Sequence, residues 1–368
     1  MTPHVKPARS AEPVTPLTPL TPLGAEPCED VRHARNALAA PAALGRGRAA
    51  VEPLLRTAVR SLPGGVRAVA EYHLGWRDPT GAPAAARAGK AIRPALVLAA
   101  ARAVGGREED ALGAAAAAEL VHDFTLLHDD VIDRDATRRH RPTAWTVFGS
   151  AQAIVAGDAM AALAVRLVAD RTEAVLRLSD CVAELCEGQY QDCSFEARAT
   201  VTLAEATAMA EAKTGALLGA ACALGGLYGG AAPEVTSALD SFGRGIGTAF
   251  QLIDDLLGIW GDPEITGKPV GADLAARKKS LPVVAALLSG TGAGDELAVL
   301  YAGGGPLGAA GIARATALVE AAGGRDWARQ EASVRAGRAL ECLARAVPDP
   351  AATAELVSLC ELITRREH

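Results

Sequence analysis

Hydrophobic residues recur along most of the chain with the spacing of amphipathic helices. Val51, Leu54, Leu55 and Val59 follow one another at intervals of one turn, which places them on one helical face. The Pro-Gly-Gly sequence at 63–65 ends this helix. Further helices are predicted over residues 66–74, 94–104, 108–133, 143–169, 171–197, 203–227, 233–260, 282–288, 311–322, 327–346 and 351–366.

The residue composition favours closely packed helices over β-sheets. Hydrophobic residues make up 50% of the 368 positions, but aromatic residues only 4%. A core of Ala, Leu and Val suits helices, whereas strands favour β-branched and aromatic residues. No stretch alternates between apolar and polar residues as a half-buried strand does. We therefore predict an all-α fold, with one domain over residues 46–368.

The first 45 residues differ in composition from the rest of the chain. Seven of the 21 prolines lie within the first 27 positions, and residues 15–23 repeat Thr-Pro-Leu three times. Proline at every third position favours a polyproline-like conformation without amide donors. We predict a disordered extension over residues 1–45. The alternative is a docking peptide that presents Leu17, Leu20 and Leu23 along one edge.

Charge and hydropathy limit the partners and the compartment. The net charge is −6 and the isoelectric point about 5.7, so a nucleic-acid partner is not expected. The uncharged run over 214–233 consists mostly of Gly and Ala, which indicates buried helices and no membrane span. No apolar export segment is visible near the start, so we expect reduced cysteines and a cytoplasmic protein.

Three carboxylates stand together at the end of a predicted apolar helix, at Asp129, Asp130 and Asp133. Asp129 and Asp133 are four residues apart, so they project from one face. Carboxylates at a helix C-terminus repel one another and oppose the helix dipole. A cation should therefore neutralise them, and hard oxygen ligands without a nearby Cys indicate Mg²⁺. The alternative is a solvated acidic helix end.

A second acidic pair, Asp254 and Asp255, follows another apolar helix about 125 residues downstream. Two such helix ends facing each other across a bundle predict a Mg²⁺–diphosphate site. Basic residues, each of which alone is more often a surface charge, lie near these motifs in the sequence. They are Lys90, Arg93, Arg138, Arg139, Lys213, Lys268 and Lys278.

In this order and spacing the motifs resemble those of the trans-isoprenyl diphosphate synthases, the polyprenyl synthetase family, over roughly residues 46–365. The resemblance implies an isoprenoid synthase-type bundle around a central cavity. It also implies Mg²⁺-dependent condensation of isopentenyl diphosphate with an allylic diphosphate, by a homodimer. The matching segments are GKAIRP at 89–94, LLHDDVID at 126–133, RRHRPT at 138–143, GDA at 157–159, GQYQD at 188–192, KTG at 213–215, FQLIDD at 250–255 and GDPEITGKPVGADL at 261–274.

The resemblance further implies a role for each matching residue. Asp129 and Asp133 match ligands of two Mg²⁺ ions and Asp254 the ligand of a third, with Asp130 and Asp255 beside them in the catalytic motifs. The residues that match allylic-diphosphate contacts are Arg138, Lys213, Thr214, Gln251 and Lys268, and Lys278 is expected to bind substrate too. Those that match the isopentenyl diphosphate pocket are Lys90, Arg93, His122 and Arg139, with a core or capping role as the alternative for His122.

One position departs from the family pattern. The second acidic motif usually carries a third Asp where this chain has Gly258, and Asp262 is too far along the helix to replace it. We expect activity to survive with weaker binding of the third ion. Asp254→Ala should nearly abolish turnover, while Gly258→Asp should change little.

Product length is expected to depend on Phe124 and Thr125. Phe124 lies five residues before Asp129, about 7.5 Å down the helix, where its ring would act as a floor for the growing tail. An ordinary core role is the alternative. In the family, one aromatic residue beside a small one resembles enzymes that make C20 geranylgeranyl diphosphate, with C15 farnesyl diphosphate as the next candidate.

Two other functions remain as alternatives, and the N-terminal extension raises a separate question of a partner. A class I terpene cyclase would carry Asn, Ser or Thr, and Glu in its second metal motif, where this chain has Asp254 and Asp255. A non-catalytic subunit of a heteromeric synthase would not need an intact first motif. The extension over residues 1–45 is also similar in character to those of enzymes packaged as cargo in encapsulin-type protein shells.

Overall fold

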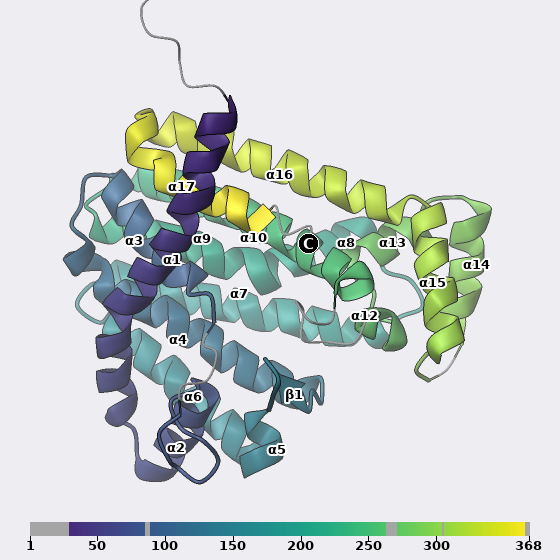
Figure 1. Cartoon of the computed structure of the whole chain (residues 1–368), viewed down its shortest axis with the longest axis horizontal. Helices are drawn as coiled ribbons and strands as arrows, with labels where there is room; N and C mark the ends of the chain where they lie inside the picture. Colours follow the sequence, from purple (N-terminus) through teal and green to yellow (C-terminus); the bar gives the residue numbers. More distant parts are fainter. Residues whose placement is uncertain (1–28, 85–88, 263–270, 304, 365–368) are drawn as a thin grey trace, which may run out of the picture.

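The computed structural model describes residues 29–84, 89–262, 271–303 and 305–364, with side chains described from residue 40 onward. These residues are almost entirely helical, which confirms the predicted all-α fold (Figure 1). The helices are α1 (Glu29–Arg60), α2 (Gly64–His73), α3 (Ile92–Ala103), α4 (Glu108–Ile132), α5 (Ala144–Phe148), α6 (Ser150–Leu167), α7 (Thr172–Ala197), α8 (Leu203–Ala210), the π-helical turn η1 (Glu211–Gly215), α9 (Ala216–Tyr228), α10 (Pro233–Trp260), α12 (Ala272–Ala275), α13 (Leu281–Leu287), α14 (Gly292–Ala302), α15 (Ala309–Ala321), α16 (Gly324–Ala346) and α17 (Pro350–Thr364).

The helices α4, α9 and α10 lie inside the bundle, and the others surround them. The helix α4 packs against α3, α6 and α9, while α10 packs against α9 and α16. Five consecutive alanines at 114–118 are fully buried in α4, and small side chains of this kind let neighbouring helix backbones approach closely. A second hydrophobic cluster lies under α12 to α15, at the end of the molecule drawn on the right of Figure 1. The acidic ends of α4 and α10 are thus held by well-packed helices.

The helix α1 begins well before the expected domain boundary. It starts at Glu29, so residue 46 falls in its interior, and Ala40 and Ala43 are buried in the core. It lies beside α17, where Glu355 pairs with Arg46 of α1 and with Arg102 of α3 (Figure 1). The proposed docking residues Leu17, Leu20 and Leu23 lie outside the described part of the chain.

Several elements differ from those that the hydrophobic pattern predicts. The helix expected over 143–169 is divided into α5 and α6 at Gly149, whose φ of 99° no continuing helix adopts. Two strands of two residues each, β1 (Thr137–Arg138) and β2 (Arg141–Pro142), form a small antiparallel hairpin. The helices α12 and α14 were not expected, because their segments are short and rich in Gly and Ala.

One helix of the described chain, α6, is long and apolar enough to cross a membrane by length and composition. The bent pair α13 and α14 passes the same test only if its two parts are counted as one span. However, α6 packs along α4 and beside α2 and α5. The core helix of a bundle passes such a test as readily as a spanning helix does.

Candidate active site

The C-terminal end of α4 carries the first acidic motif. Asp129 is partly buried, whereas Asp133 is exposed one turn further on. Burial raises the pKa of Asp129, and the negative charge of Asp133 raises it further, while Lys213 and Arg138 lower it. A cation bound at this helix end would offset the unfavourable charge of the partly buried Asp129 carboxylate.

Asp130 lies on the inner side of α4 and has a different environment. It is 1% exposed, and Arg138 donates a hydrogen bond from Nε to its Oδ1 over 2.6 Å. Its Oδ2 is buried and has no hydrogen-bond partner among the residues that the structure describes. Asp130 therefore fixes the position of Arg138 beside the acidic helix end, and the pair occupies the base of the hairpin β1–β2.

The second acidic pair lies near the end of α10, and it too has one buried and one more exposed carboxylate. Asp255 is buried, and its oxygens accept hydrogen bonds from the Leu281 N–H over 2.9 Å and from Gln251 Nε2 over 2.7 Å. Burial raises its pKa to about 7. Gln251 also accepts a hydrogen bond from the Thr214 hydroxyl over 2.6 Å. Asp255 thus joins α10 to the start of α13, while Asp254 is partly exposed beside it.

Two lysines lie between these acidic helix ends and share one carboxylate. Nζ of Lys213 lies 2.6 Å, and Nζ of Lys278 3.2 Å, from Oδ2 of Asp192 on α7. Burial raises the pKa of Asp192, but the two lysines outweigh this effect and hold it below its usual value. Lys278 is also influenced by Asp133 of α4 and Asp255 of α10, which together with Asp192 keep it charged despite its burial. The lysines therefore bridge the two acidic motifs.

A π-helical turn brings Lys213 and Thr214 into the site. The turn η1 interrupts the helix formed by α8 and α9, as π-turns often do at functional sites. It packs against α7 at Gly188, where a Cβ atom would lie 2.5 Å from the backbone nitrogen of Lys213. The GQYQD motif therefore contributes both this close approach and, at Asp192, the acceptor of the lysine.

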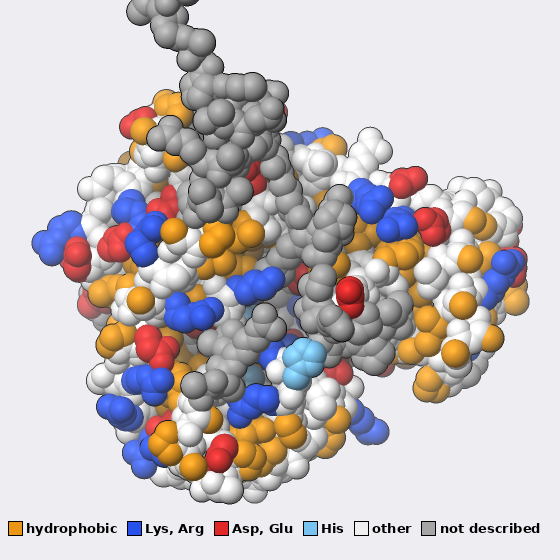
Figure 2. All heavy atoms as spheres, viewed as in Figure 1, with side chains coloured by type: hydrophobic (Ala, Val, Ile, Leu, Met, Phe, Trp, Pro, Cys, Tyr) orange, Lys and Arg blue, Asp and Glu red, His pale blue; other side chains and the backbone are white. Residues whose placement is uncertain are grey.

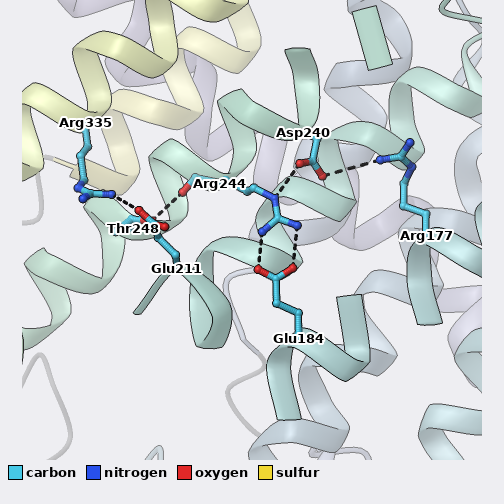
Figure 3. A network of polar contacts seen from close by, with 7 residues as sticks. All are labelled: Arg177, Glu184, Glu211, Asp240, Arg244, Thr248 and Arg335. Atoms are coloured by element: carbon cyan, nitrogen blue, oxygen red, sulfur yellow. Dashed lines mark hydrogen bonds and ion pairs between the residues drawn. The ribbon is translucent and has the colours of Figure 1, made fainter. Parts of the chain in front are cut away.

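Polar contacts from neighbouring helices surround this turn (Figure 3). Arg335 of α16 donates from Nη1 to Glu211, the first residue of η1, over 2.5 Å. Arg244 of α10 binds both carboxylate oxygens of Glu184 on α7, at 2.6 and 2.8 Å, and Asp240 on its own helix at 2.7 Å. These ion pairs tie α7, α10 and α16 together around η1, so the orientation of Lys213 depends on more than its direct partner.

A second basic group lies beside the first acidic motif. Burial and the charges of Arg93 and Arg139 lower the pKa of His122 well below its usual value, so this histidine is neutral near pH 7. Arg93 lies near Glu119, and its buried Nε has no hydrogen-bond partner within the described part of the chain. Burial raises the pKa of Glu119 to about 7. A group of this kind has unused donors for an anionic ligand.

A small cavity lies on the side of Arg138 and Arg139 that faces α2. Figure 2 shows Lys and Arg side chains, with a histidine among them, around the middle of the face that it draws. Arg139 adopts a left-handed backbone conformation, with φ of 51°, and its guanidinium packs against Gly89. The lining residues are Tyr72, His73, Asp130, Arg138, Arg139, Arg141, Pro142, Thr143 and Ala144.

Of the remaining predicted site residues, all but Lys268 lie in the described part of the chain. Lys90 is exposed in the loop before α3, and Lys268 lies outside the described residues. Phe124 is 5% exposed and its ring meets that of His128 edge-on, with centroids 5.6 Å apart. Thr125 donates its hydroxyl hydrogen bond to the carbonyl of His122 over 2.7 Å.

The carboxylates fit Mg²⁺ with an incomplete set of protein ligands. Within the described residues, no three His, Cys, Asp or Glu side chains converge closely enough to hold a metal ion by themselves. Mg²⁺ binds through one or two carboxylates and completes its octahedron with water and phosphate oxygens. The raised pKa of Asp129, beside the second carboxylate of Asp133, indicates a demand for positive charge at this point.

Three residues of this region were not among the predicted site residues. Asp192 and Asp273 lie in motifs that the sequence displays, GQYQD and GADL, but neither belongs to a run of adjacent carboxylates like those at 129–130 and 254–255. Glu119 lies in an Ala-rich part of α4 without any motif. Position in a motif was a usable signal for the first two residues, and nothing in the sequence distinguished the third.

Comparisons with known proteins identify the family of this chain. A family model described as polyprenyl synthetase matches residues 82–306. A geranylgeranyl diphosphate synthase from Mycobacterium tuberculosis is 48% identical over 89% of this chain and 94% of its own length. A (2E,6E)-farnesyl diphosphate synthase from Mycobacterium bovis is 45% identical over 88% of this chain and 92% of its own length. The crystal structure of a polyprenyl synthetase from Streptomyces coelicolor superposes with a TM-score of 0.83, at 41% identity, over 88% of this chain and 99% of that one. The chain therefore belongs to the polyprenyl synthetase family of prenyltransferases.

Proposed function

We propose that this protein condenses isopentenyl diphosphate head-to-tail with an allylic diphosphate, and that its main product is C20 geranylgeranyl diphosphate, with C15 farnesyl diphosphate as the next candidate. One observation carries the proposal: Lys213 and Lys278 lie between the acidic ends of α4 and α10 and share Asp192. A site with carboxylates for divalent cations and lysines for phosphate oxygens suits a diphosphate. The two mycobacterial relatives described above are named as synthases of geranylgeranyl and farnesyl diphosphate, which are products of this class of reaction.

The chemistry that we propose follows from the charges. Departure of the diphosphate from the allylic carbon builds negative charge on the leaving group and positive charge on carbon. Three bound Mg²⁺ ions, held by Asp129, Asp133 and Asp254, would supply most of the positive charge that stabilises the leaving group. Lys213, Lys278 and Arg138 add fixed cations at the same place, and Lys268 is proposed as a further contact.

The second basic group is proposed to bind isopentenyl diphosphate. Arg93, Arg139 and Lys90 would pair with its phosphate oxygens, and the neutral His122 would donate a hydrogen bond to it. The isopentenyl double bond then attacks the allylic cation, and transfer of a proton to the departed diphosphate completes the five-carbon extension. The hydroxyl of Thr214 and the amide of Gln251 present oxygen dipoles near the developing charge.

A product assay tests the proposed function. Purified protein, Mg²⁺ and isopentenyl diphosphate are incubated separately with dimethylallyl, geranyl and farnesyl diphosphates, and the chain lengths are determined after dephosphorylation. We expect a ladder that ends at C20 and that is lost when EDTA is added. A ladder ending at C15 would keep the synthase but exclude the C20 product, and no elongation from any starter would contradict the proposal.

Two other functions account less well for the same residues. A terpene cyclase has no use for a second anion-binding group like that of Arg93 and His122. A non-catalytic subunit has no use for the carboxylate pair Asp129 and Asp133 beside two lysines. A cyclic hydrocarbon product, or activity only after a second polypeptide is added, would favour one of these alternatives over ours.

We also propose that the enzyme is a homodimer. Val155 on α6 and Leu176 and Tyr190 on α7 are large apolar side chains that are 53%, 59% and 71% exposed. Exposed side chains of this kind on neighbouring helices suit the face of a second copy. Analytical ultracentrifugation should give twice the chain mass, and Leu176→Glu should shift the protein towards the monomer.

Docking to a protein shell through the N-terminal segment remains a separate proposal. Its support is the Thr-Pro-Leu repeat over residues 15–23. The truncated protein for this test should keep the whole of α1, because a truncation at residue 46 would remove the buried Ala40 and Ala43. Full-length protein should co-purify with a shell protein, while a chain starting at residue 29 should not, and equal recovery of both would contradict the proposal.

A further inference from the structure

The carboxylate of Asp273 fills the space beside Gly258. A Cβ atom added at Gly258 would lie 2.3 Å from Oδ2 and 2.9 Å from Cγ of Asp273. No side chain therefore fits at position 258 unless Asp273 moves. Gly258 follows Asp254 by four residues on α10, so the space beside it lies on the helix face from which Asp254 projects. Thus a carboxylate from another element occupies the place one turn beyond Asp254.

The short helix α12 fixes the position of Asp273. Leu274 is fully buried in the second hydrophobic cluster, which anchors the helix from below. Gly271 begins the helix with φ of 70°, and the Lys278 N–H donates to the Asp273 carbonyl over 2.8 Å. The backbone on both sides of Asp273 is thereby held, so its carboxylate reaches Gly258 through a defined geometry.

The charge of Asp273 acts on the proposed site. It raises the pKa of Asp255 and contributes to keeping Lys278 charged. Both oxygens of Asp255, in contrast, accept hydrogen bonds that join α10 to α13. Asp255 is therefore used in packing, and the next carboxylate at this end of α10 is that of Asp273.

We propose that Asp273 supplies the third carboxylate of the second acidic cluster, and that it binds, directly or through one water molecule, the same divalent cation as Asp254. Gly258 then makes room for the Asp273 carboxylate. The absence of an Asp at position 258 therefore does not leave the cluster one carboxylate short. This inference rests on the proposed function, because the cation is the one that accompanies the diphosphate. It also changes the expectation for Gly258→Asp, since the new side chain would displace Asp273.

Metal binding tests the inference without turnover. Mn²⁺ is titrated into the full-length protein in the presence of methylenediphosphonate, a non-hydrolysable diphosphate, and the bound ions are counted by electron paramagnetic resonance. We expect Asp273→Asn to weaken the most weakly bound Mn²⁺ by about tenfold or more. Gly258→Ala should weaken the same ion without removing any carboxylate, because its methyl group displaces Asp273. The double variant Gly258→Asp with Asp273→Ala should restore part of the affinity.

The control is Glu341→Gln, which removes one negative charge from an exposed position on α16. It should leave all Mn²⁺ affinities unchanged, and circular dichroism should show that each variant is folded. Unchanged affinities in both Asp273→Asn and Gly258→Ala would overturn the role of Asp273 while leaving the proposed function in place. If the unaltered protein binds no additional Mn²⁺ with the diphosphonate, both the inference and the metal-dependent function are contradicted.

Discussion

Lys213 donates from Nζ to Oδ2 of Asp192 over 2.6 Å, and this contact joins the π-helical turn η1 to α7. Lys278 lies 3.2 Å from the same oxygen. One carboxylate cannot neutralise two lysines, so the group keeps a net positive charge. Asp192 therefore positions both lysines while leaving them able to attract an anion.

The first prediction concerns this shared carboxylate. Asp192→Asn should lower kcat/KM by about a hundredfold, because two cations lose the acceptor that orients them. KM for the allylic substrate should rise together with the fall in kcat. Steady-state kinetics with a C10 or C15 starter measure both quantities. Asp180→Asn, on the exposed side of the same helix, is the matched control. Equal kinetics of the two variants would refute the positioning role.

The second prediction concerns the ion pair that holds the first residue of η1. Glu211→Gln should raise the allylic KM several-fold, because Arg335 no longer anchors the turn that presents Lys213. Glu331→Gln provides a close comparison, since Glu331 binds the same arginine over 2.7 Å but belongs to α16. We expect it to have little effect on KM. Similar KM values for both variants would show that η1 is held without this pair.

The third prediction concerns the metal-binding carboxylates. Asp254→Ala should nearly abolish turnover, whereas Glu341→Gln should retain it. The reason is that a cation at the end of α10 loses its principal protein ligand. Turnover should be followed as a function of Mg²⁺ concentration. Any residual activity of Asp254→Ala should need a higher Mg²⁺ concentration than the unaltered enzyme does. Turnover of Asp254→Ala close to that of the unaltered enzyme would contradict the assignment.

The fourth prediction concerns stability and pH. Burial raises the pKa of Asp255 from its usual value of 3.8 to about 7 in the folded protein, so the folded state binds this proton more tightly than the unfolded state does. Its contribution to stability is therefore fully present below the usual value and is lost as the pH rises to about 7. The free energy of unfolding should fall over this range by up to about 1.4 kcal/mol per pH unit.

Urea unfolding in EDTA, at several values from about pH 5 to about pH 8, measures this effect. The side chain in Asp255→Asn cannot titrate. The difference in the free energy of unfolding between the unaltered protein and this variant should therefore shrink or reverse as the pH rises. Glu119, whose pKa is also raised to about 7 by burial, adds a slope of the same sign in both proteins. A difference that stays constant with pH would contradict the assignment to Asp255.

The fifth prediction concerns product length. Phe124→Ala should shift the products towards chains longer than C20, because loss of the ring that meets His128 opens space one and a half turns below Asp129. Phe242→Leu is the control for loss of a buried ring, since it lies about 18 Å along α10 from Asp254. An unchanged product distribution in Phe124→Ala would argue that this ring is ordinary core.

Periodic apolar spacing was sufficient to predict most of the helices, because each buries one face against its neighbours. It failed at Gly149, where a single glycine with positive φ separates α5 from α6 while apolar residues continue on both sides. It also failed for α1, whose first turns contain proline and few large apolar residues. The helix α1 as a whole packs against α17, α3 and α4, and this tertiary contact is not visible in the local sequence pattern.

The acidic and basic motifs could be recognised in the sequence. Which of their residues pack in the interior and which face the site could not be predicted from it. Asp254 and Asp255 are neighbours in the chain, yet only Asp255 reaches the Leu281 N–H and becomes part of the packing. Neighbouring residues on a helix point about 100° apart, and tertiary context decides which of them faces the site. The relation of Asp273 to Gly258 joins positions 15 residues apart across segments of different structure, so no local pattern predicts it.

The contact between α1 and α17 has a consequence for synthesis on the ribosome. The helix α1 is translated long before α17, against which part of it packs. The part of α1 that faces α17 therefore stays uncovered in the nascent chain until α17 leaves the exit tunnel, whereas α3 and α4 cover other parts of α1 earlier. An uncovered apolar face of this kind binds chaperones or other nascent chains. Ribosome-stalled chains that lack residues 350–364 should accordingly recruit more chaperone than full-length chains do.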